Sequence, residues 1–171
     1  MDKKYSVEVR ALTKRFGRFT AVDHLDLSVP EGEIFGFLGA NGAGKTTAIR
    51  MLCGLLLPTS GEAWVNGFDI WKESEQIKRS IGYMSQKFSL YEDLTVYENL
   101  ELFAGIYGLG GKRFKERLAG MVDRLGLEEH LPKMTSSIPL GWKQKAALAA
   151  ATMHDPSIVF LDEPTGGVDP V

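Results

Sequence analysis

The stretch that most constrains this chain of 171 residues is Gly39–Thr46, GANGAGKT. It has the spacing G-x-x-x-x-G-K-T, in which glycines let the backbone approach phosphate oxygens and present successive N–H groups to them. The preceding apolar run, EIFGFLGA at residues 33–40, predicts a central strand buried on both faces of a parallel sheet. A helix is expected from Lys45 to about Cys53, and its N-terminus favours anions. We therefore expect the chain to bind a nucleoside triphosphate.

Individual roles follow from this loop chemistry. Lys45 is expected to place its charge on the β- and γ-phosphates, and the Thr46 hydroxyl to ligate Mg²⁺. The remaining residues expected to contact the nucleotide are Gly39, Asn41, Gly42, Ala43, Gly44 and Thr47.

A second apolar run, SIVFLDEP, ends in two acidic residues. As a strand it would carry Asp162 to its tip, where a carboxylate can hold Mg²⁺. Glu163, one residue further, would be suited to orient or deprotonate a water molecule. Together with the phosphate loop, these acids predict a hydrolytic site.

Between the two motifs the pattern changes from strands to helices. Alternating residues predict strands over 5–12 and 23–30, Asn66-Gly67 predicts a hairpin, and EQIKRSIGYMSQ predicts a short helix followed by a strand. Three helices are then expected, in LTVYENLELFAGIYG, with Thr95 and Glu98 as a capping box, in RFKERLAGMVDRLGL and in KQKAALAAATM. This order predicts a layered α/β core with a helical insertion.

Composition narrows the function. The net charge of −2 gives no support for a nucleic-acid partner. A single cysteine, Cys53, excludes an internal disulfide, and we expect it to pack in the core. No run reaches the ~18 apolar residues of a membrane helix and no signal peptide is recognised, so a cytosolic chain is expected. His24 and His130 are expected at the surface, and His154 is not expected to act in catalysis.

In their order along the chain, these motifs resemble the nucleotide-binding domain of an ATP-binding cassette (ABC) transporter. The resemblance runs from residue 5 to the end, through KRFGRFTAVD, GANGAGKTT, YMSQ, FLDEP and GGVDP, and SLYEDLTVYENL is most similar to drug- and polymer-export cassettes of the ABC-2 type. It implies a P-loop NTPase core with a mainly parallel sheet, an N-terminal antiparallel β subdomain and a helical insertion. The core would comprise residues 5–86 and 152–171 and the helical subdomain residues 87–151, in one domain.

The resemblance also implies roles for residues outside the two motifs. Phe16 would stack on the adenine of ATP, and Gln86 would reach Mg²⁺ and the attacking water. Asp169 would lie in the loop that crosses a dimer interface, and Phe88–Asp93 in the region that receives a membrane subunit. The implied partners are a second cassette, identical or different, and a transmembrane permease, which would hold this ATPase at the inner face of the membrane.

One motif departs from the family. The signature Leu-Ser-Gly-Gly-Gln, which clamps the γ-phosphate of a partner's ATP, is replaced by Ile138-Pro139-Leu140-Gly141-Trp142. Pro139 removes a hydroxyl and an N–H group, which leaves the Gly141 and Trp142 amides and the helix N-terminus. Loss of one such donor can cost ~10²–10³ in rate. Trp142 could compensate by packing against the partner.

Other functions remain open at this point. The altered turn allows a regulatory cassette with weak turnover, and a soluble cassette acting on ribosomes or DNA is a third reading. A P-loop GTPase is disfavoured because Asn66-Gly67-Phe68-Asp69 lacks the lysine of the guanine-reading motif. The family continues beyond the position of Val171 with a switch histidine and further elements. The chain is therefore expected to be incomplete and, alone, to bind ATP but hydrolyse it weakly.

Overall fold

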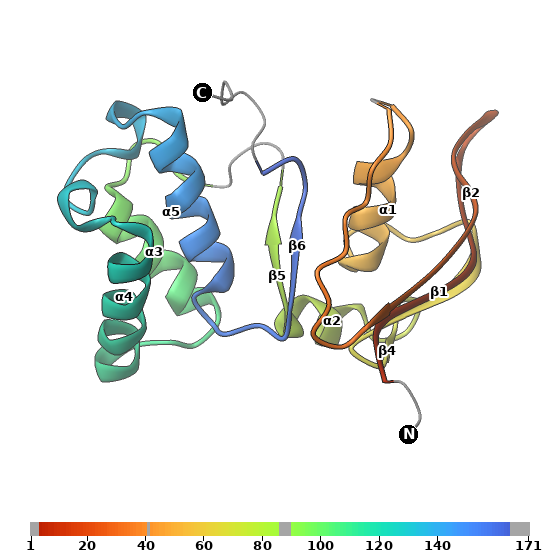
Figure 1. The fold of residues 1–171 in the computed structure, drawn as a ribbon, viewed down its shortest axis with the longest axis horizontal. Coiled ribbons are helices and arrows are strands. Elements are labelled where there is room, and N and C mark those ends of the chain that lie inside the picture. The colour runs from red at the N-terminus through yellow and green to blue at the C-terminus, as the bar shows by residue number, and fades with distance from the viewer. Residues whose placement is uncertain (1–3, 41, 86–89, 165–171) are drawn as a thin grey trace. The chain divides into compact units, whose positions relative to one another are not determined.

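The computed structural model describes residues 4–40, 42–85 and 90–164, and it divides the chain into two compact units, Met1–Ile81 and Gly82–Val171 (Figure 1). Each unit has its own secondary structure. This division falls after residue 81, whereas the family resemblance implies boundaries of the helical subdomain at residues 87 and 151. Those subdomain boundaries stay a prediction.

The first unit is built on an antiparallel sheet of four strands in the order β2-β1-β3-β4. β1 (Tyr5–Phe16) pairs with β2 (Phe19–Pro30) on one side and with β3 (Ser60–Val65) on the other. β4 is the short strand Phe68–Asp69. Alternation along β1 buries Val7 and Val9, and β3 buries Ala63 and Val65 in register with them. This confirms the N-terminal strands and the antiparallel β subdomain that the sequence predicts.

The turn between β3 and β4 confirms the predicted hairpin. Asn66 has φ 56° and Gly67 has φ 79°. Two successive residues with positive φ match the right-handed twist of the flanking strands, and Asn-Gly is the pair that adopts them most easily. α1 (Lys45–Leu52) and α2 (Ser74–Ser80) complete the first unit. Cys53 follows α1 and is buried, as predicted.

Residues 33–40 do not form the predicted central strand. The structure assigns no regular element to them, and Ile34 and Leu38 are fully or almost fully exposed, at 104% and 94%. A strand buried on both faces needs a hydrogen-bonded neighbour at each edge. The described residues of the first unit give this segment neither, so the apolar pattern alone does not produce a strand.

The second unit packs three helices around one apolar core, beside a pair of parallel strands, β5 (Ile81–Met84) and β6 (Ile158–Leu161). The helices are α3 (Val96–Ile106), α4 (Gly111–Leu125) and α5 (Leu140–Thr152), and they lie side by side in Figure 1. α5 buries four alanines, Ala146, Ala147, Ala149 and Ala150. Such small side chains allow close packing against α3, whose Val96, Leu100 and Ala104 are buried.

Two short 3₁₀ turns, η1 (Glu128–His130) and η2 (Thr135–Ser137), connect α4 to α5. The Thr95–Glu98 capping box forms as predicted at the start of α3. The three helices and the final strand therefore confirm the pattern that the sequence predicts. No helix in the described part of the chain is long and apolar enough to cross a membrane.

Candidate functional site

The phosphate loop ends in a left-handed turn that only glycine adopts without strain. Gly42 has φ 80° and Gly44 has φ 81°, and Gly44 is the N-cap of α1. A Cβ on Gly44 would overlap the carbonyl oxygen of Ala21 in β2. Glycine at position 44 is thus required twice, for its dihedral angle and for the close approach of the two backbones. This turn delivers the chain directly into the first turn of α1.

Lys45 is the first residue of α1, and its side chain folds back over the loop. Its Nζ donates to the carbonyl oxygens of Gly39, at 2.7 Å, and Ala40, at 2.9 Å. The cation therefore lies over the loop at the N-terminal end of α1. The Lys45 ammonium and the N–H groups at the start of α1 both attract negative charge, so together they favour an anion at the loop. Asn41 lies outside the described residues.

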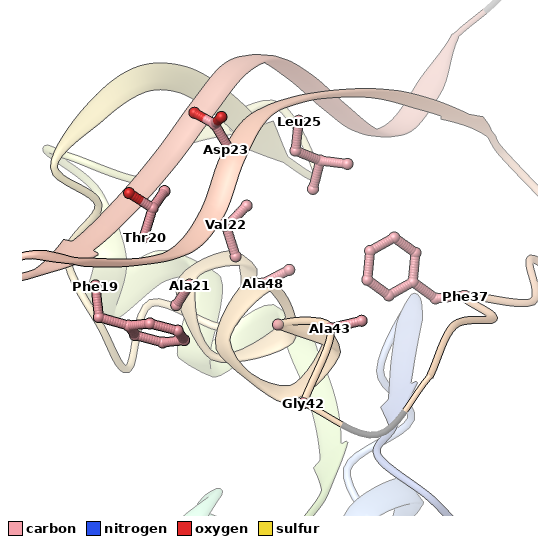
Figure 2. A pocket seen from close by; sticks show the side chains of 11 residues that line it. Phe19, Thr20, Ala21, Val22, Asp23, Leu25, Phe37, Gly42, Ala43 and Ala48 are labelled. Carbon is pink, nitrogen blue, oxygen red and sulfur yellow. The ribbon is translucent and has the colours of Figure 1, made fainter.

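A pocket of about 400 Å³ lies beside this loop. As Figure 2 shows, residues of β2 form one side, the loop residues Gly42 and Ala43 and the helix residue Ala48 form another, and the Phe37 ring faces in. Its walls are mostly apolar or small, with Asp23 as an acidic member. A concave, mostly apolar site next to a phosphate-binding turn suits the base and sugar of a nucleotide.

Two aromatic rings stand at the end of the β1–β2 hairpin. Phe16 and Phe19 are register partners there and are 49% and 62% exposed. Phe19 lines the pocket, whereas Phe16, the residue predicted to stack on adenine, is not among its lining residues. The Lys14 ammonium lies 5.1 Å from the centroid of the Phe16 ring. Sequence reasoning missed Phe19, although its place two residues after the hairpin glycine could have pointed to it.

The two predicted acids lie in the second unit, at the carboxyl end of β6. Asp162 is buried, at 2% exposure, and its N–H donates to the carbonyl oxygen of Met84 over 2.9 Å. Glu163 is exposed and has φ 53°, an unusual conformation for a residue other than glycine. The chain therefore turns sharply at Glu163, directly after the buried Asp162. The separate roles expected for the two acids stay a prediction. Gln86 and Asp169 lie outside the described residues, as does Phe88.

The signature position forms the start of α5. Pro139 is the N-cap, with φ −58° and ψ 154°, and makes no side-chain cap. Its carbonyl oxygen accepts from the Trp142 N–H, at 3.0 Å, and from the Lys143 N–H, at 3.1 Å. Of the two amides expected to face a phosphate, that of Trp142 is thus already engaged. Gly141 is the second residue of α5, so the carbonyl four positions before it lies outside the helix.

Trp142 packs within its own unit. The His130 ring stacks on the indole, with centroids 4.0 Å apart and 18° between the planes, and Lys145 Nζ lies 4.2 Å from the indole centroid. His130 is thus partly exposed, and its contact with the Trp142 ring was not predicted from the sequence. A histidine among charged residues still has an apolar ring face, and here an indole covers it. His154 likewise stacks on Tyr107, with centroids 3.6 Å apart.

Comparison with known proteins gives one consistent family. The family model described as "ABC transporter" matches residues 22–166. The chain is 52% identical to the "Probable multidrug ABC transporter ATP-binding protein YbhF" of Escherichia coli (strain K12), over 96% of the chain and 28% of that protein. It is 41% identical to the "Bacitracin transport ATP-binding protein BcrA" of Bacillus licheniformis, over 96% of the chain and 53% of that protein.

Solved structures agree with these relatives. A protein described as the ATP-binding subunit of an ABC transporter superposes with a TM-score of 0.84 at 32% identity, over 96% of this chain and 68% of that one. The cbiO1 protein of Clostridium perfringens gives a TM-score of 0.86 at 27% identity, over 98% of this chain and 69% of that one. The chain spans about a quarter of the length of the first of these two sequence relatives and about half of the length of the second.

Proposed function

We propose that this chain, which belongs to the ABC transporter family, binds ATP in its first unit and hydrolyses it to drive export through a membrane partner. The observation that carries the proposal is the phosphate loop. Its left-handed Gly42 and Gly44 lead into the N-terminus of α1, with the Lys45 ammonium above the loop and a pocket beside it.

Binding follows from these parts. The α1 amides and the Lys45 ammonium would hold the phosphates, and Lys45 Nζ would exchange its loop carbonyls for phosphate oxygens. The pocket between β2 and the loop would take the nucleoside. From the family resemblance, Phe16 would stack on the base. Phe19 is the rival for that role, because it lines the pocket.

Hydrolysis would use the acids after β6. Thr46, Asp162 and Gln86 have the oxygen donors that Mg²⁺ prefers, and the bound ion would stabilise charge on the phosphates. The buried Asp162 is suited to hold a cation, because a carboxylate away from water gains from a paired positive charge. The exposed Glu163, in its sharp turn, is suited to orient or deprotonate the attacking water.

The signature turn would complete a second copy of the site. In a head-to-tail dimer, Pro139–Trp142 would face the partner's ATP and Asp169 would lie at the interface. The second copy could be an identical or a different cassette. The names of the relatives, a multidrug and a bacitracin transport protein, support export as the purpose. A permease would then hold the cassette at the inner face of the membrane.

A second candidate is a regulatory cassette that binds ATP with little turnover. The observation that favours it is the signature turn, where Pro139 supplies no side-chain cap and the Trp142 amide is engaged within α5. A soluble cassette without a membrane partner remains a third candidate, which copurification with a membrane protein would exclude.

The deciding experiment measures ATP binding and ATPase activity of the protein with its membrane subunit, for wild type and Glu163→Gln. The export motor requires turnover in the wild type, and intact binding with lost turnover in Glu163→Gln. Binding without turnover in both would establish the regulatory cassette. Turnover that does not depend on Glu163 would refute the assignment of the general base.

A further inference from the structure

A buried asparagine in α3 joins two segments that are distant in sequence. Asn99 is 0% exposed. Its Oδ1 accepts from the Tyr91 N–H at 2.8 Å, and its Nδ2 donates to the Tyr91 carbonyl at 2.9 Å. The same Nδ2 donates to the Thr95 carbonyl at 3.0 Å and to Thr135 Oγ1 at 3.0 Å. One carboxamide therefore binds the segment before α3 and the segment before α5.

The burial of this group is informative because a buried amide is costly unless its hydrogen bonds are made. Among the described residues, the buried polar or charged ones are Thr13, Asn99, Thr135 and Asp162. Two of these four, Asn99 and Thr135, are bonded to each other. A leucine at position 99 would extend the apolar face of α3. The asparagine instead fixes the geometry of two loops.

Backbone hydrogen bonds extend the same connection. The Thr135 N–H donates to the Leu94 carbonyl at 2.9 Å, and the Ser136 N–H donates to the Glu92 carbonyl at 3.1 Å. Thr95 and Met134 form an antiparallel bridge. Residues 92–95 and 134–136 are therefore paired as a short ladder, which we call the strap.

The strap reaches α5 through a side chain as well. Lys143 Nζ lies 2.9 Å from Glu92 Oε1. The Lys143 side chain is 17% exposed and the Glu92 side chain is 70% exposed, so the pair lies at the surface with its lysine partly covered. Only three residues separate Ser136, in the ladder, from Leu140, the first residue of α5, and one of them, Ile138, is buried at 4% exposure. The turn Pro139–Trp142 thus has little freedom to move independently of residues 91–95.

We propose that Asn99 is a positioning residue, which with the Glu92–Lys143 pair makes residues 91–95 and the turn Pro139–Trp142 move as one body. This inference rests on the proposed function, in which the region Phe88–Asp93 receives the membrane subunit and the turn faces the partner's ATP. A displacement of residues 91–93 by the membrane subunit is then delivered to the turn through the strap. The strap couples permease contact to ATP hydrolysis.

The test compares ATPase activity with and without the membrane subunit in proteoliposomes. Asn99→Asp keeps the side-chain shape and the acceptor for Tyr91 but removes both N–H donors. Lys143→Met breaks the ion pair at the surface. Asn99→Asp should lower the stimulation ratio about tenfold, which lies within the usual range for coupling between sites. Lys143→Met should lower it about threefold, because the carboxylate of the pair is mostly exposed and an exposed ion pair contributes little. The KM for ATP should stay unchanged, because the phosphate loop lies in the other unit.

Matched variants separate coupling from general damage. Glu92→Lys combined with Lys143→Glu rebuilds the pair with reversed charges and should restore the ratio. Lys112→Met removes another lysine of an ion pair in the same unit, the Lys112–Glu116 pair at 3.6 Å, and should leave the ratio unchanged. If Asn99→Asp fails to fold, the Lys143 series decides. If the membrane subunit stimulates the wild type and Lys143→Met leaves the stimulation ratio unchanged, the proposed role of the strap in coupling is wrong.

If the membrane subunit does not stimulate the ATPase activity of the wild type, the proposed membrane contact is wrong, and the result says nothing against the coupling of the strap to the turn. Hydrogen exchange on the protein alone then decides. Lys143→Met should speed exchange of the Thr135 and Ser136 amides together with that of residues 142–146. Faster exchange confined to α5, with the ladder amides unchanged, would show that the two segments are independent and would overturn the inference.

Discussion

The backbone of Gly44 lies so close to Ala21 that a Cβ on Gly44 would overlap the Ala21 carbonyl oxygen. The contact joins the N-cap of α1 to β2, whose residues also line the adjoining pocket. The loop is thereby held against the sheet before any nucleotide arrives. Such preorganisation lowers the cost of ordering a site on binding.

We expect Gly44→Ala to abolish ATP binding. The substitution introduces strain at φ 81°, about 1–2 kcal/mol, and also forces the loop away from Ala21. Gly42→Ala is the matched control, because Gly42 has φ 80° but open space around its Cβ position. Isothermal titration with ATP should show a much smaller loss for Gly42→Ala. Equal losses in the two variants would mean that backbone strain alone, and not the contact with Ala21, sets the effect.

The two rings at the hairpin end can be separated by nucleotide binding. If Phe16 stacks on the base as proposed, Phe16→Ala should weaken ATP binding by about 1–3 kcal/mol, the usual range for base–aromatic stacking. Phe19→Ala should have a smaller effect through loss of a pocket wall. Titration of both variants with ATP and with inorganic triphosphate isolates the contribution of the base. The reverse order of losses would assign the stacking role to Phe19.

The capping box of α3 should make stability depend on pH. Hydrogen bonds from the Thr95 N–H and hydroxyl lower the pKa of Glu98. A carboxyl whose pKa is depressed in the fold stabilises it above the unfolded pKa, and this stabilisation is lost as pH falls through the folded pKa. Glu98→Gln should therefore flatten the acid limb of the stability curve, measured by denaturant unfolding. Glu101→Gln is the control for loss of one α3 carboxylate.

Thr95→Ala should lower the free energy of unfolding by about 1 kcal/mol at neutral pH, because it removes the N-cap acceptor for the Glu98 N–H. In the Thr95→Ala background, Glu98→Gln should also have a smaller effect on stability at acidic pH, because the Thr95 and Glu98 side chains form one capping box. Additive effects in the double variant would contradict that coupling.

How much the sequence predicts depends on the range of the signal. The Thr95–Glu98 box and the Asn66-Gly67 turn were predictable because each is set by residues within four positions. The phosphate loop was predictable for the same reason, since its spacing fixes backbone geometry locally. The Glu98 bonds and the positive φ of Asn66 are the direct outcome.

Features that depend on distant partners were not predictable. The stacking of His130 on Trp142 joins residues twelve positions apart, from η1 to the start of α5. Asn99 looks like an ordinary polar residue until Thr135, 36 positions away, is placed against it. The apolar run 33–40 was predicted to be a strand and does not form one. A strand needs hydrogen-bonded neighbours at its edges, and the sequence of the run itself cannot show whether they are present.

At the start of α5, Pro139 stands where the family resemblance implies a serine. Pro139→Ser would return a hydroxyl and an N–H group to the N-cap of α5, where Ser is a favoured residue and proline makes no side-chain cap. If the altered turn limits turnover, kcat with the membrane subunit should rise about tenfold or more, since one preorganised donor is worth up to 10²–10³ in rate.

Pro139→Ala is the matched control, because it restores the N–H without the hydroxyl. A rise only in the serine variant would assign the deficit to the lost hydroxyl, and an equal rise in both would assign it to the lost amide. Trp142 packs on His130 in either case and is not expected to change, which its fluorescence can check. No rise in either variant would mean that the Gly141 amide and the α5 N-terminus already suffice, so the proline does not weaken the site.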